Sequence, residues 1–562
     1  MISSVTKRPL LTAAFFIWFF VYVRYSPEIT GLIPTRLYLE NLFFLSLPAA
    51  ILVIGRNPRR LDKMGLILLV PIAYYLSLFF VTDNTFAKSA FLSATSIYFT
   101  LFALAVVLGG RDLSRPADWI SSGLIAISLA VIIQTFGGLG TYSLSIPGLP
   151  VLEFGSPSHF GGFGQRNVMA SFVACLITWS VAESLSRPET RVSRFQLIAL
   201  AVGAFVVTVS GSKIGILGLF VGGVSALVWL RFISSMPVRR PAYELFGAVI
   251  MGVLVGYLVS NIEGRLTGLD RFATEMTIGD SGIVLESSFS TRINAWYSAL
   301  ITWWSNPMIG AGPGGFLRGF QEVALQEQLP LSGQPLVFNF LHSHNMLLQA
   351  LAEGGLVRVV LTAMPLAIWF ILVLRSWTAR FLGMVALSPI LLHSLTEYPF
   401  ETSGLHWLLV GVIPLSLREP LGSDHVIHPT PAIGSRLLLP CLMVSCMTVG
   451  YLQLTSLRAI TDLNILKGIN NELLTDWYAG DERVVAAMSH PIVGPYATQL
   501  VYQEASVVLS ASSEKASLVV MQPFAQDALD WFPSRNAYEL YLITAAENKD
   551  PALLKSAKNT SN

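Results

Sequence analysis

The sequence predicts an all-α polytopic membrane protein with about thirteen transmembrane helices, a large outer loop carrying interfacial helices, and a C-terminal helical domain on the same face. Hydrophobic residues make up 53% of the chain and charged residues 12%, and the mean hydropathy is +0.61. Soluble domains carry about 25% charged residues, so a soluble fold is excluded. The net charge of +2 gives no field that would attract nucleic acid, and we expect a lipid membrane as the partner instead.

Apolar segments of membrane-crossing length recur along the first four-fifths of the chain. A helix needs roughly 17 to 22 apolar residues to cross the hydrocarbon layer. The first segment follows Lys7 and Arg8 as a signal peptide would, but no small-x-small cleavage site closes it, so we expect a retained helix. The predicted spans are 10–23, 37–55, 64–82, 89–109, 117–136, 167–185, 196–212, 214–230, 243–260, 356–374, 381–396, 404–417 and 436–455.

The basic residues predict which loops face the cytoplasm. Short loops rich in lysine and arginine stay inside the cell, and every second predicted loop is basic while the opposite loops carry few cations. With a cytoplasmic N-terminus, thirteen spans place the C-terminal tail outside, which predicts a bacterial inner-membrane protein with a periplasmic tail. The basic loops contain Arg56, Arg59, Arg60 and Lys63, then Arg111 and Arg115, then Arg187, Arg191 and Arg194, then Arg231, Arg239 and Arg240, and then Arg375 and Arg380.

These patterns divide the chain into four parts. Residues 1–260 hold the N-terminal spans, 261–355 form a large outer loop, 356–455 hold the remaining spans, and 456–562 form a periplasmic helical domain. In the tail, apolar residues recur at three- and four-residue spacing, which is typical of an amphipathic helix. These residues are Ile460, Leu463, Leu466, Ile469 and Leu473.

Two polar motifs lie directly before predicted spans on the outer face. GGFGQRN, Gly161 to Asn167, is either a glycine turn with an interfacial arginine anchor or a ligand site in which Gln165 and Asn167 offer amide donors and Arg166 a fixed cation. In SGSK, Ser210 to Lys213, the lysine either snorkels to the interface or pairs with a phosphate at that depth.

The large loop contains an aromatic stretch, STRINAWYSALITWWSNPMIGAGPGGF. Arg292 precedes Trp296, Tyr297, Trp303 and Trp304, a pattern that suits a helix lying in the membrane interface. The glycine cluster that follows resembles a nucleotide-binding loop only superficially, because no β-strand is expected before it.

The stretch LHSHNMLLQ, Leu341 to Gln349, places two histidines and an asparagine beside an apolar run. A pair of histidines two residues apart is half of a metal site, and with no third ligand nearby we expect no metal. The alternatives are interfacial histidines with satisfied hydrogen bonds, or a catalytic base. If Ser343 or its neighbour caps the following helix, His344 lies in its first turn, where the helix dipole favours an anion and keeps the ring neutral. His342 and His344 would then face nearly opposite directions.

A last outer-face turn, HSLTEYPFETSG, carries Glu397 and Tyr398. A tyrosine before proline at a membrane boundary is usually an anchor, whereas a carboxylate at that depth favours a functional role. The four motifs come from distant positions but share one predicted face, so we expect them to form a single site in the outer leaflet.

Together these segments resemble the bacterial O-antigen ligase and polymerase superfamily, and within it the protein O-oligosaccharyltransferases of the PglL/PilO kind. The matching pieces are GGFGQRN, SGSK where the family usually has Ser-Arg, TRINAWYSAL followed by NPMIGAGPGGF, HSHNMLLQALAEGGL, and EYPF. In the ligase pattern of His-Asn, nine residues, Gly, two residues, Gly, the chain has His344, Asn345 and Gly355, and Arg358 stands in place of the last glycine.

The resemblance implies a glycosyltransferase that moves a glycan en bloc from a polyprenyl-diphosphate donor to a hydroxyl, without metal or other cofactor. It implies that His344, Gln165 and Tyr398 are catalytic and that Arg292 holds the diphosphate. We expect Lys213 and Arg166 to add positive charge there, and His342, Asn345, Asn167 and Glu397 to support the site.

The functional alternatives differ in the molecule that accepts the glycan. The glutamine motif, the Glu397-Tyr398 turn and the outer tail favour a serine or threonine of an exported protein such as a pilin. Ligation to lipopolysaccharide or polymerisation of glycan repeats is the second hypothesis. A polyprenyl-glycan flippase is the third, and it is disfavoured because transporters place polar residues near the membrane midplane and show internal repeats.

Overall fold

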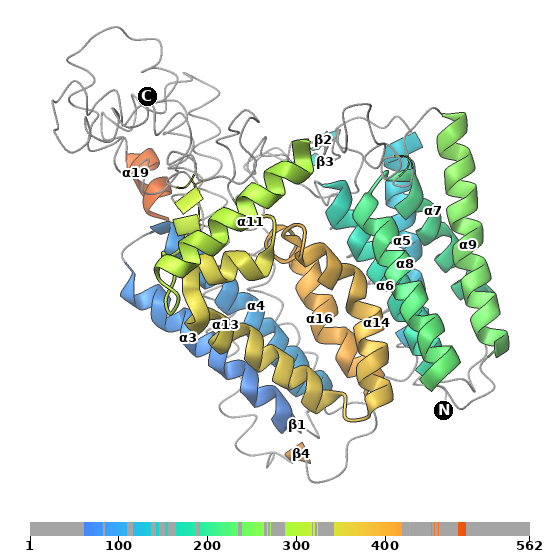
Figure 1. The fold of residues 1–562 in the computed structure, drawn as a ribbon, viewed down its shortest axis with the longest axis horizontal. Helices are drawn as coiled ribbons and strands as arrows, with labels where there is room; N and C mark the ends of the chain where they lie inside the picture. Colours follow the sequence, from blue (N-terminus) through green and yellow to red (C-terminus); the bar gives the residue numbers. More distant parts are fainter. Residues whose placement is uncertain are drawn as a thin grey trace, which may run out of the picture. The chain divides into compact units, whose positions relative to one another are not determined.

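The computed structural model describes the greater part of the chain between residues 61 and 427 (Figure 1). The predicted spans 10–23 and 37–55, and nearly all of the span 436–455 and of the predicted C-terminal domain, lie outside the described residues. The described residues are 61–82, 85–109, 116–136, 142–144, 152–154, 165–186, 192–233, 239–263, 267, 270, 287–316, 319–320, 323, 342–418, 426–427, 451, 455, 459 and 482–490.

The described chain is helical, accompanied by two small antiparallel ladders. In one ladder β1 (Leu61–Asp62) pairs with β4 (Val426–Ile427), and in the other β2 (Tyr142–Leu144) pairs with β3 (Leu152–Phe154). The helices are η2 (Lys63–Leu68), α3 (Leu69–Val81), α4 (Thr85–Gly109), α5 (Pro116–Phe136), α6 (Arg166–Ser186), α7 (Arg194–Val209), α8 (Lys213–Val228), η3 (Trp229–Ile233), α9 (Arg239–Ile262), α11 (Ser287–Ser305), α13 (Met346–Val373), α14 (Trp377–Ser394), α15 (Pro399–Thr402), α16 (Gly404–Leu417) and α19 (Glu482–Ser489).

Each of the ten predicted spans within the described chain coincides with a helix. The agreement follows from length, since a continuous apolar run satisfies its backbone hydrogen bonds only as a helix when it is surrounded by hydrocarbon. Among the described residues, five helices are long and apolar enough to cross a membrane: Met64–Val81, Arg166–Ser186, Lys213–Phe232, Ala242–Ile262 and Met346–Val373. A polytopic helical fold is therefore confirmed, whereas the full count of thirteen spans stays a prediction.

Two compact units make up the chain. The first contains the described parts of Met1–Leu69, Ile97–Val284 and Pro365–Ser445, and the second contains those of Val70–Ser96, Leu285–Met364 and Cys446–Asn562.

The helix α6 is the centre of the first unit, and its residues from Val168 to Leu185 are all buried. Its early residue Ser171 bonds to the late α14 residue His393, whereas its later residue Thr178 bonds to Ala386, so α6 and α14 run antiparallel. The N-terminus of α6 therefore lies at the same end of the unit as the turn that follows α14.

Glycines let α8 approach α6 and α14 closely. A Cβ added at Gly222 would lie 2.3 Å from Thr178 Cγ2, and one added at Gly218 would lie 2.8 Å from Pro389 Cβ. Without hydrophobic attraction between helices inside a membrane, close packing of this kind supplies much of the association energy.

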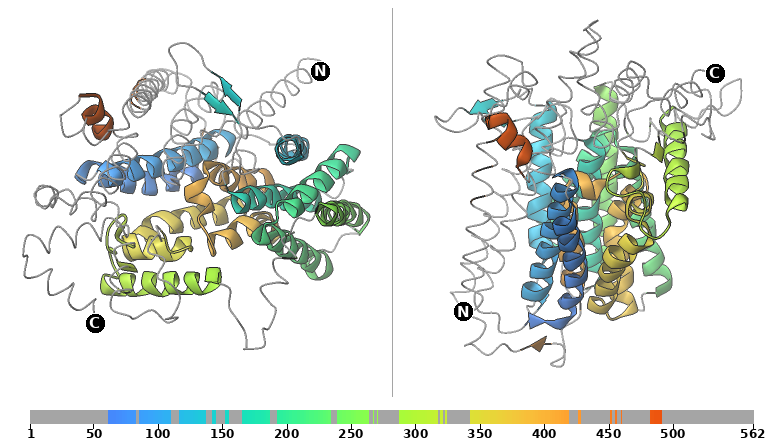
Figure 2. Two further views of the ribbon diagram at one scale, coloured as in Figure 1. Left: turned by 90° about the horizontal axis from the view of Figure 1, so that it is seen from above. Right: turned by 90° about the vertical axis from the view of Figure 1, so that its left-hand side faces the viewer.

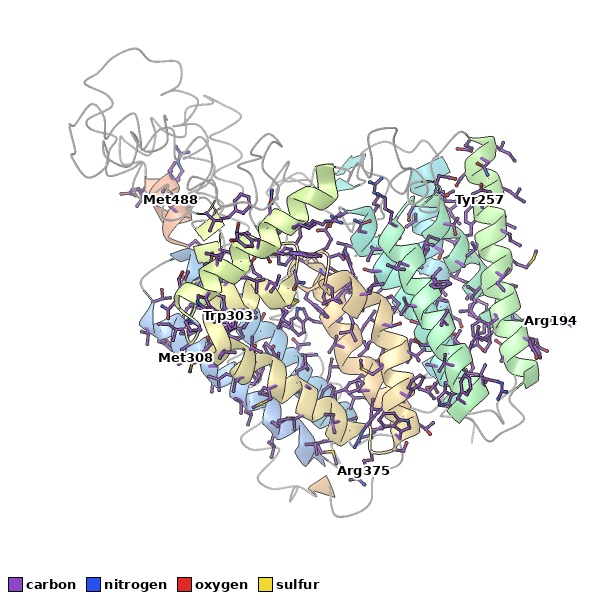
Figure 3. The ribbon with its side chains drawn as sticks, in the orientation of Figure 1. Arg194, Tyr257, Trp303, Met308, Arg375 and Met488 are labelled. Atoms are coloured by element: carbon purple, nitrogen blue, oxygen red, sulfur yellow. The ribbon has the colours of Figure 1, made fainter. Side chains whose placement is uncertain are left out.

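The outer surface of the first unit is apolar along α9, which packs beside α7 (Figures 1 and 2). Side chains project from α9 away from the bundle around Tyr257 (Figure 3), and Ile250, Met251 and Leu258 are each more than half exposed. Exposing an apolar helix face of this length to water costs free energy, whereas exposing it to lipid is favourable. This is expected of a membrane-spanning helix.

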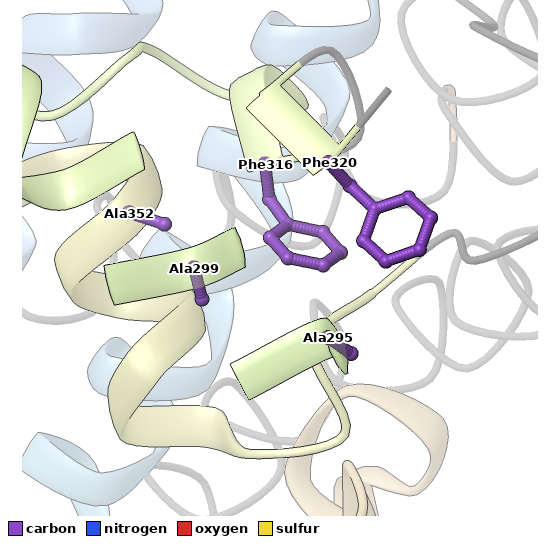
Figure 4. Close-up of a cluster of buried hydrophobic side chains, with 5 residues drawn as sticks. All are labelled: Ala295, Ala299, Phe316, Phe320 and Ala352. Carbon is purple, nitrogen blue, oxygen red and sulfur yellow. The ribbon is translucent and has the colours of Figure 1, made fainter. Parts of the chain in front are cut away.

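In the second unit, α11 packs against the first turns of α13. Ala295 and Ala299 of α11 meet Ala352 of α13, and Phe316 and Phe320 close the cluster (Figure 4). The three alanines let the two backbones come close, while the phenylalanine rings supply the buried apolar area. This core fixes the aromatic stretch of the large loop against the histidine motif.

Candidate functional site

The histidine motif forms a short loop that ends at a capped helix. Asn345 Oδ1 accepts hydrogen bonds from the backbone N–H groups of Leu347 at 3.0 Å and Leu348 at 3.1 Å, and α13 begins at Met346. The capping residue is thus Asn345, and the expectation that Ser343 or its neighbour caps the helix with His344 in the first turn is wrong. Asparagine takes this role because its short side chain reaches the unpaired N–H groups of the first turn.

His344 precedes the cap with a left-handed backbone, at φ 51°. Since the two histidines lie in a loop and not on a helix, their rings turn toward each other and meet edge to face, with centroids 4.6 Å apart. The expectation that they face opposite directions is therefore wrong. A non-glycine residue in this conformation is uncommon and strained, so the fold holds His344 there through other contacts.

A chain of hydrogen bonds provides those contacts. The Ser343 N–H donates to Gln349 Oε1 at 2.9 Å, and Gln349 Nε2 donates to Glu353 Oε1 at 2.7 Å. The same carboxylate accepts the Gly314 N–H at 3.1 Å and Arg358 Nη1 at 3.1 Å. Three donors on one largely buried carboxylate make a rigid support, which extends from the glycine cluster to the histidine loop.

A break in α13 at Gly355 receives the glycine-rich loop. Gly355 has φ 60° and ψ −162°, which separates a short first helix from the long apolar one, at the position where the sequence predicts the span to begin. The N–H groups of Leu356 and Val357 donate to the carbonyls of Pro307 and Met308 at 2.9 and 3.0 Å. The loop thus satisfies backbone groups that the break exposes.

Arg358, which stands where the family pattern has its last glycine, bridges this break. Its guanidinium reaches back to Glu353 Oε2 at 3.1 Å, and the two side chains are only 23% and 13% exposed. An arginine with such a partner therefore joins the two helices on either side of Gly355.

Arg292 belongs to the same unit as the histidines. It lies on α11 one turn before Trp296, on the same face, and Trp296 Nε1 donates to the His344 carbonyl at 3.4 Å. Arg292 is within the helix, which begins at Ser287 and so starts before the stretch that the aromatic pattern indicates.

In the first unit, two helix N-termini meet. Gln165 and Arg166 open α6 and Lys213 opens α8. Ser212 caps α8 by accepting the Gly215 N–H at 3.1 Å and donates its hydroxyl to Asn167 Oδ1 at 2.9 Å. The dipoles of both helices favour an anion here, and Arg166 and Lys213 add two cations.

The Glu397-Tyr398 turn lies at this same end of the first unit, after α14. Tyr398 is 1% exposed and Glu397 7% exposed, so the tyrosine ring packs inside the protein and is not an anchor at the lipid surface. A buried carboxylate beside it needs hydrogen-bond partners, as expected of a structured turn.

The structure therefore groups the predicted residues into two sets. The first unit holds Gln165, Arg166, Asn167, Lys213, Glu397 and Tyr398, and the second holds Arg292, His342, His344 and Asn345. The geometry above describes each set within its own unit, and the meeting of the two sets in one site stays a prediction.

The supporting residues Trp296, Gln349 and Glu353 are absent from the sequence-based site. Gln349 and Glu353 are four residues apart in a largely apolar helix, and polar residues with that spacing share a helix face. This spacing is the signal that could have revealed them.

Residues 196–363 match the family model of the O-antigen ligase. This part of the chain is therefore similar to the O-antigen ligase family. The match supports membership of the superfamily that the sequence resembles, and it supports glycan transfer as the activity of that superfamily. No curated protein matches the sequence significantly.

The matched residues include Lys213, Arg292 and both histidines of the motif, and the match ends in α13. Gln165, Glu397 and Tyr398 lie outside it. The apolar helices and this match together fit a multi-pass membrane protein.

Replacing Asn345 with alanine should lower the free energy of unfolding by about 1 kcal/mol, since the first turn loses its cap, and should also reduce glycan transfer because His344 adjoins the cap. Thermal unfolding and a transfer assay in detergent measure the two effects. Ser376→Ala is the matched control, because Ser376 caps α14 by accepting the Ala379 N–H at 3.1 Å. Equal loss of transfer in both variants would contradict a specific role for Asn345.

Proposed function

We propose that this protein transfers a glycan en bloc from a polyprenyl-diphosphate donor to a serine or threonine hydroxyl of an exported protein, such as a pilin, at the periplasmic face of the bacterial inner membrane. The observation that carries the proposal is the strained His344 loop at a helix N-terminus within the residues that match the O-antigen ligase family. Backbone strain of this kind persists mainly at functional sites. Because Gln349 and Glu353 support the strained loop, we infer that the position of the His344 ring is functionally important.

The proposed reaction is a single displacement at the anomeric carbon. His344 accepts the proton of the attacking hydroxyl as the new oxygen–carbon bond forms, and the bond to the diphosphate breaks with its electron pair leaving on the diphosphate. Arg292, Lys213 and Arg166 stabilise that negative charge.

The remaining residues position the reactants. Gln165 and Tyr398 orient the donor or the acceptor hydroxyl. His342 packs on the ring of His344, Asn345 caps its helix, and Asn167 accepts a hydrogen bond from the residue before Lys213. Glu397 precedes Tyr398 in the buried turn.

The test is reconstitution of the purified protein with a polyprenyl-diphosphate oligosaccharide and a serine-containing acceptor peptide. We expect a glycopeptide in the mass spectrum, with no added nucleotide sugar and no second compartment. In cells, deleting the gene should remove a glycopeptide from periplasmic proteins.

Transfer to lipopolysaccharide, or polymerisation of glycan repeats, is the second candidate, and the O-antigen ligase match supports glycan transfer to either kind of acceptor. Deletion would then alter lipopolysaccharide and leave periplasmic glycopeptides unchanged. The two outcomes separate the acceptors, and loss of both products would indicate a shared donor pathway.

Replacing Lys213 with glutamine should raise the KM for the donor roughly tenfold, a change equivalent to about 1.4 kcal/mol, because one cation at the α8 N-terminus is lost. Lys213→Arg should keep the KM near the wild-type value. Arg194→Gln is the matched control, since Arg194 also opens a helix directly after a serine cap and lies in a predicted cytoplasmic loop. An unchanged KM in Lys213→Gln would remove Lys213 from the donor site.

A further inference from the structure

A cluster of one serine and two histidines is buried within the first unit, apart from every residue assigned above. Ser171 of α6, His393 of α14 and His406 of α16 are each 0% exposed. Ser171 Oγ lies 2.8 Å from His393 Nδ1 and 3.1 Å from His406 Nε2. Polar groups at this depth are costly unless they are satisfied, and they mark functional positions more often than structural ones.

The hydrogen-bonding capacity of the serine determines which nitrogen of each ring donates to it. Ser171 Oγ also lies 3.1 Å from the Val168 carbonyl, which can only accept. A hydroxyl donates one hydrogen bond and accepts two. All three contacts are satisfied together in one arrangement only: Ser171 donates to Val168, while His393 donates through Nδ1–H and His406 through Nε2–H. The serine therefore determines which nitrogen of each ring donates a hydrogen bond.

The two histidines hold the two ends of the turn that carries Tyr398. His393 lies at the end of α14, and its carbonyl accepts the N–H groups of Thr396 at 3.0 Å and Glu397 at 2.8 Å. His406 lies in the first turn of α16, where its N–H donates to the Ser403 carbonyl at 3.2 Å.

Aromatic contacts strengthen the second anchor. The His406 ring meets Phe400 and Phe172 edge to face, with centroids 6.4 and 5.5 Å apart, and Trp407 Nε1 donates to the Phe400 carbonyl at 2.9 Å. The chain from His393 to His406 is thus fixed at both ends and in the middle.

Ser171 connects this turn to the other predicted residues of the first unit. It lies less than two helical turns after Arg166, the first residue of α6, and Gln165, the residue before it. All residues from Val168 to Leu185 are buried. A shift of the turn relative to α6 therefore requires breaking one of the two serine–histidine bonds in a medium without water to replace it.

We propose that Ser171, His393 and His406 are positioning residues that hold the Glu397-Tyr398 turn in register with Gln165 at the N-terminus of α6. The inference rests on the proposed function, since it assigns the cluster to the same reaction. Apolar residues of similar volume would fill this space at lower desolvation cost. The contribution of the polar cluster is therefore the specific arrangement of α6, α14 and α16 around it.

The test compares Ser171→Ala with Ser180→Ala on the same helix. Ser180 is equally buried and accepts Gln196 Nε2 at 2.9 Å, so both variants lose one buried hydroxyl. We expect Ser171→Ala to lower kcat about tenfold or more with KM nearly unchanged, as misplacement of catalytic groups does, and Ser180→Ala to leave kcat unchanged. His393→Asn, which keeps a donor near the Nδ1 position, should recover more activity than His393→Leu. Unchanged kcat in Ser171→Ala, or equal losses in the two serine variants, would overturn the proposal.

Nuclear magnetic resonance separates this inference from the proposed function. In protein labelled with nitrogen-15 histidine, His393 should show the Nδ1–H tautomer. In protein labelled with 3-fluorotyrosine, the fluorine signal that disappears in Tyr398→Phe should move in Ser171→Ala and stay in Ser180→Ala. Movement of that signal in a protein that transfers no glycan would refute the proposed function and leave the positioning role intact. If the protein transfers glycan and neither its fluorine signal nor its kcat changes in Ser171→Ala, the positioning role alone is refuted.

Discussion

His344→Ala should lower glycan transfer by about 10²- to 10⁴-fold, the usual contribution of a general base, while the protein stays folded in the membrane. The reason is that the other imidazole in the described loop, His342, packs edge to face on the ring of His344 and does not occupy its place. Transfer by purified protein, measured by mass spectrometry of the acceptor, tests this result.

His342→Ala provides the comparison. We expect a smaller loss, because the variant removes a support of the base and leaves the base itself. A fully active His344→Ala protein would eliminate the base assignment, and a larger loss in His342→Ala than in His344→Ala would exchange the two roles.

Gly355→Ala should destabilise the protein by about 2 kcal/mol or more. The backbone of Gly355, at φ 60° and ψ −162°, lies in a region that essentially only glycine adopts, and it costs a residue with a Cβ about 1 to 3 kcal/mol. The new Cβ would also lie 2.3 Å from the Met308 carbonyl oxygen, which is backbone and cannot rotate away. The loop that bonds to Leu356 and Val357 must then move, and the Glu353 carboxylate loses its fixed partners. We expect glycan transfer to fall together with the unfolding temperature.

Gly247→Ala in α9 is the control for a glycine substitution as such. A Cβ at Gly247 meets no atom within 4 Å among the described residues, and alanine is favoured over glycine inside a helix by about 1 kcal/mol. The variant should be as stable as the wild type or slightly more stable. A Gly355→Ala protein that unfolds at the wild-type temperature would show that α13 is continuous through this residue.

The positions of the helices could be predicted from the sequence. All ten predicted spans in the described chain coincide with helices, and the predicted start at residue 356 coincides with the break at Gly355. Apolar length and the conformational preference of glycine are properties of the local chain, so a sequence reveals them. Lys213 and the histidines could also be chosen locally, from residue types at the boundaries of these runs, whereas the role of Arg292 came from the family resemblance.

The tertiary structure decided how these residues are held. The sequence could not reveal that Asn345 caps α13, that the two histidine rings face each other, or that Tyr398 is buried. Nor could it reveal the bonds from Ser171 to His393 and His406, which join residues 222 and 235 positions apart. Contacts over such separations depend on how helices pack, and packing is set by the shapes of many side chains at once. The sequence by itself therefore determined the membrane helices and the candidate chemistry, whereas the packing of those helices determined the geometry of each candidate residue.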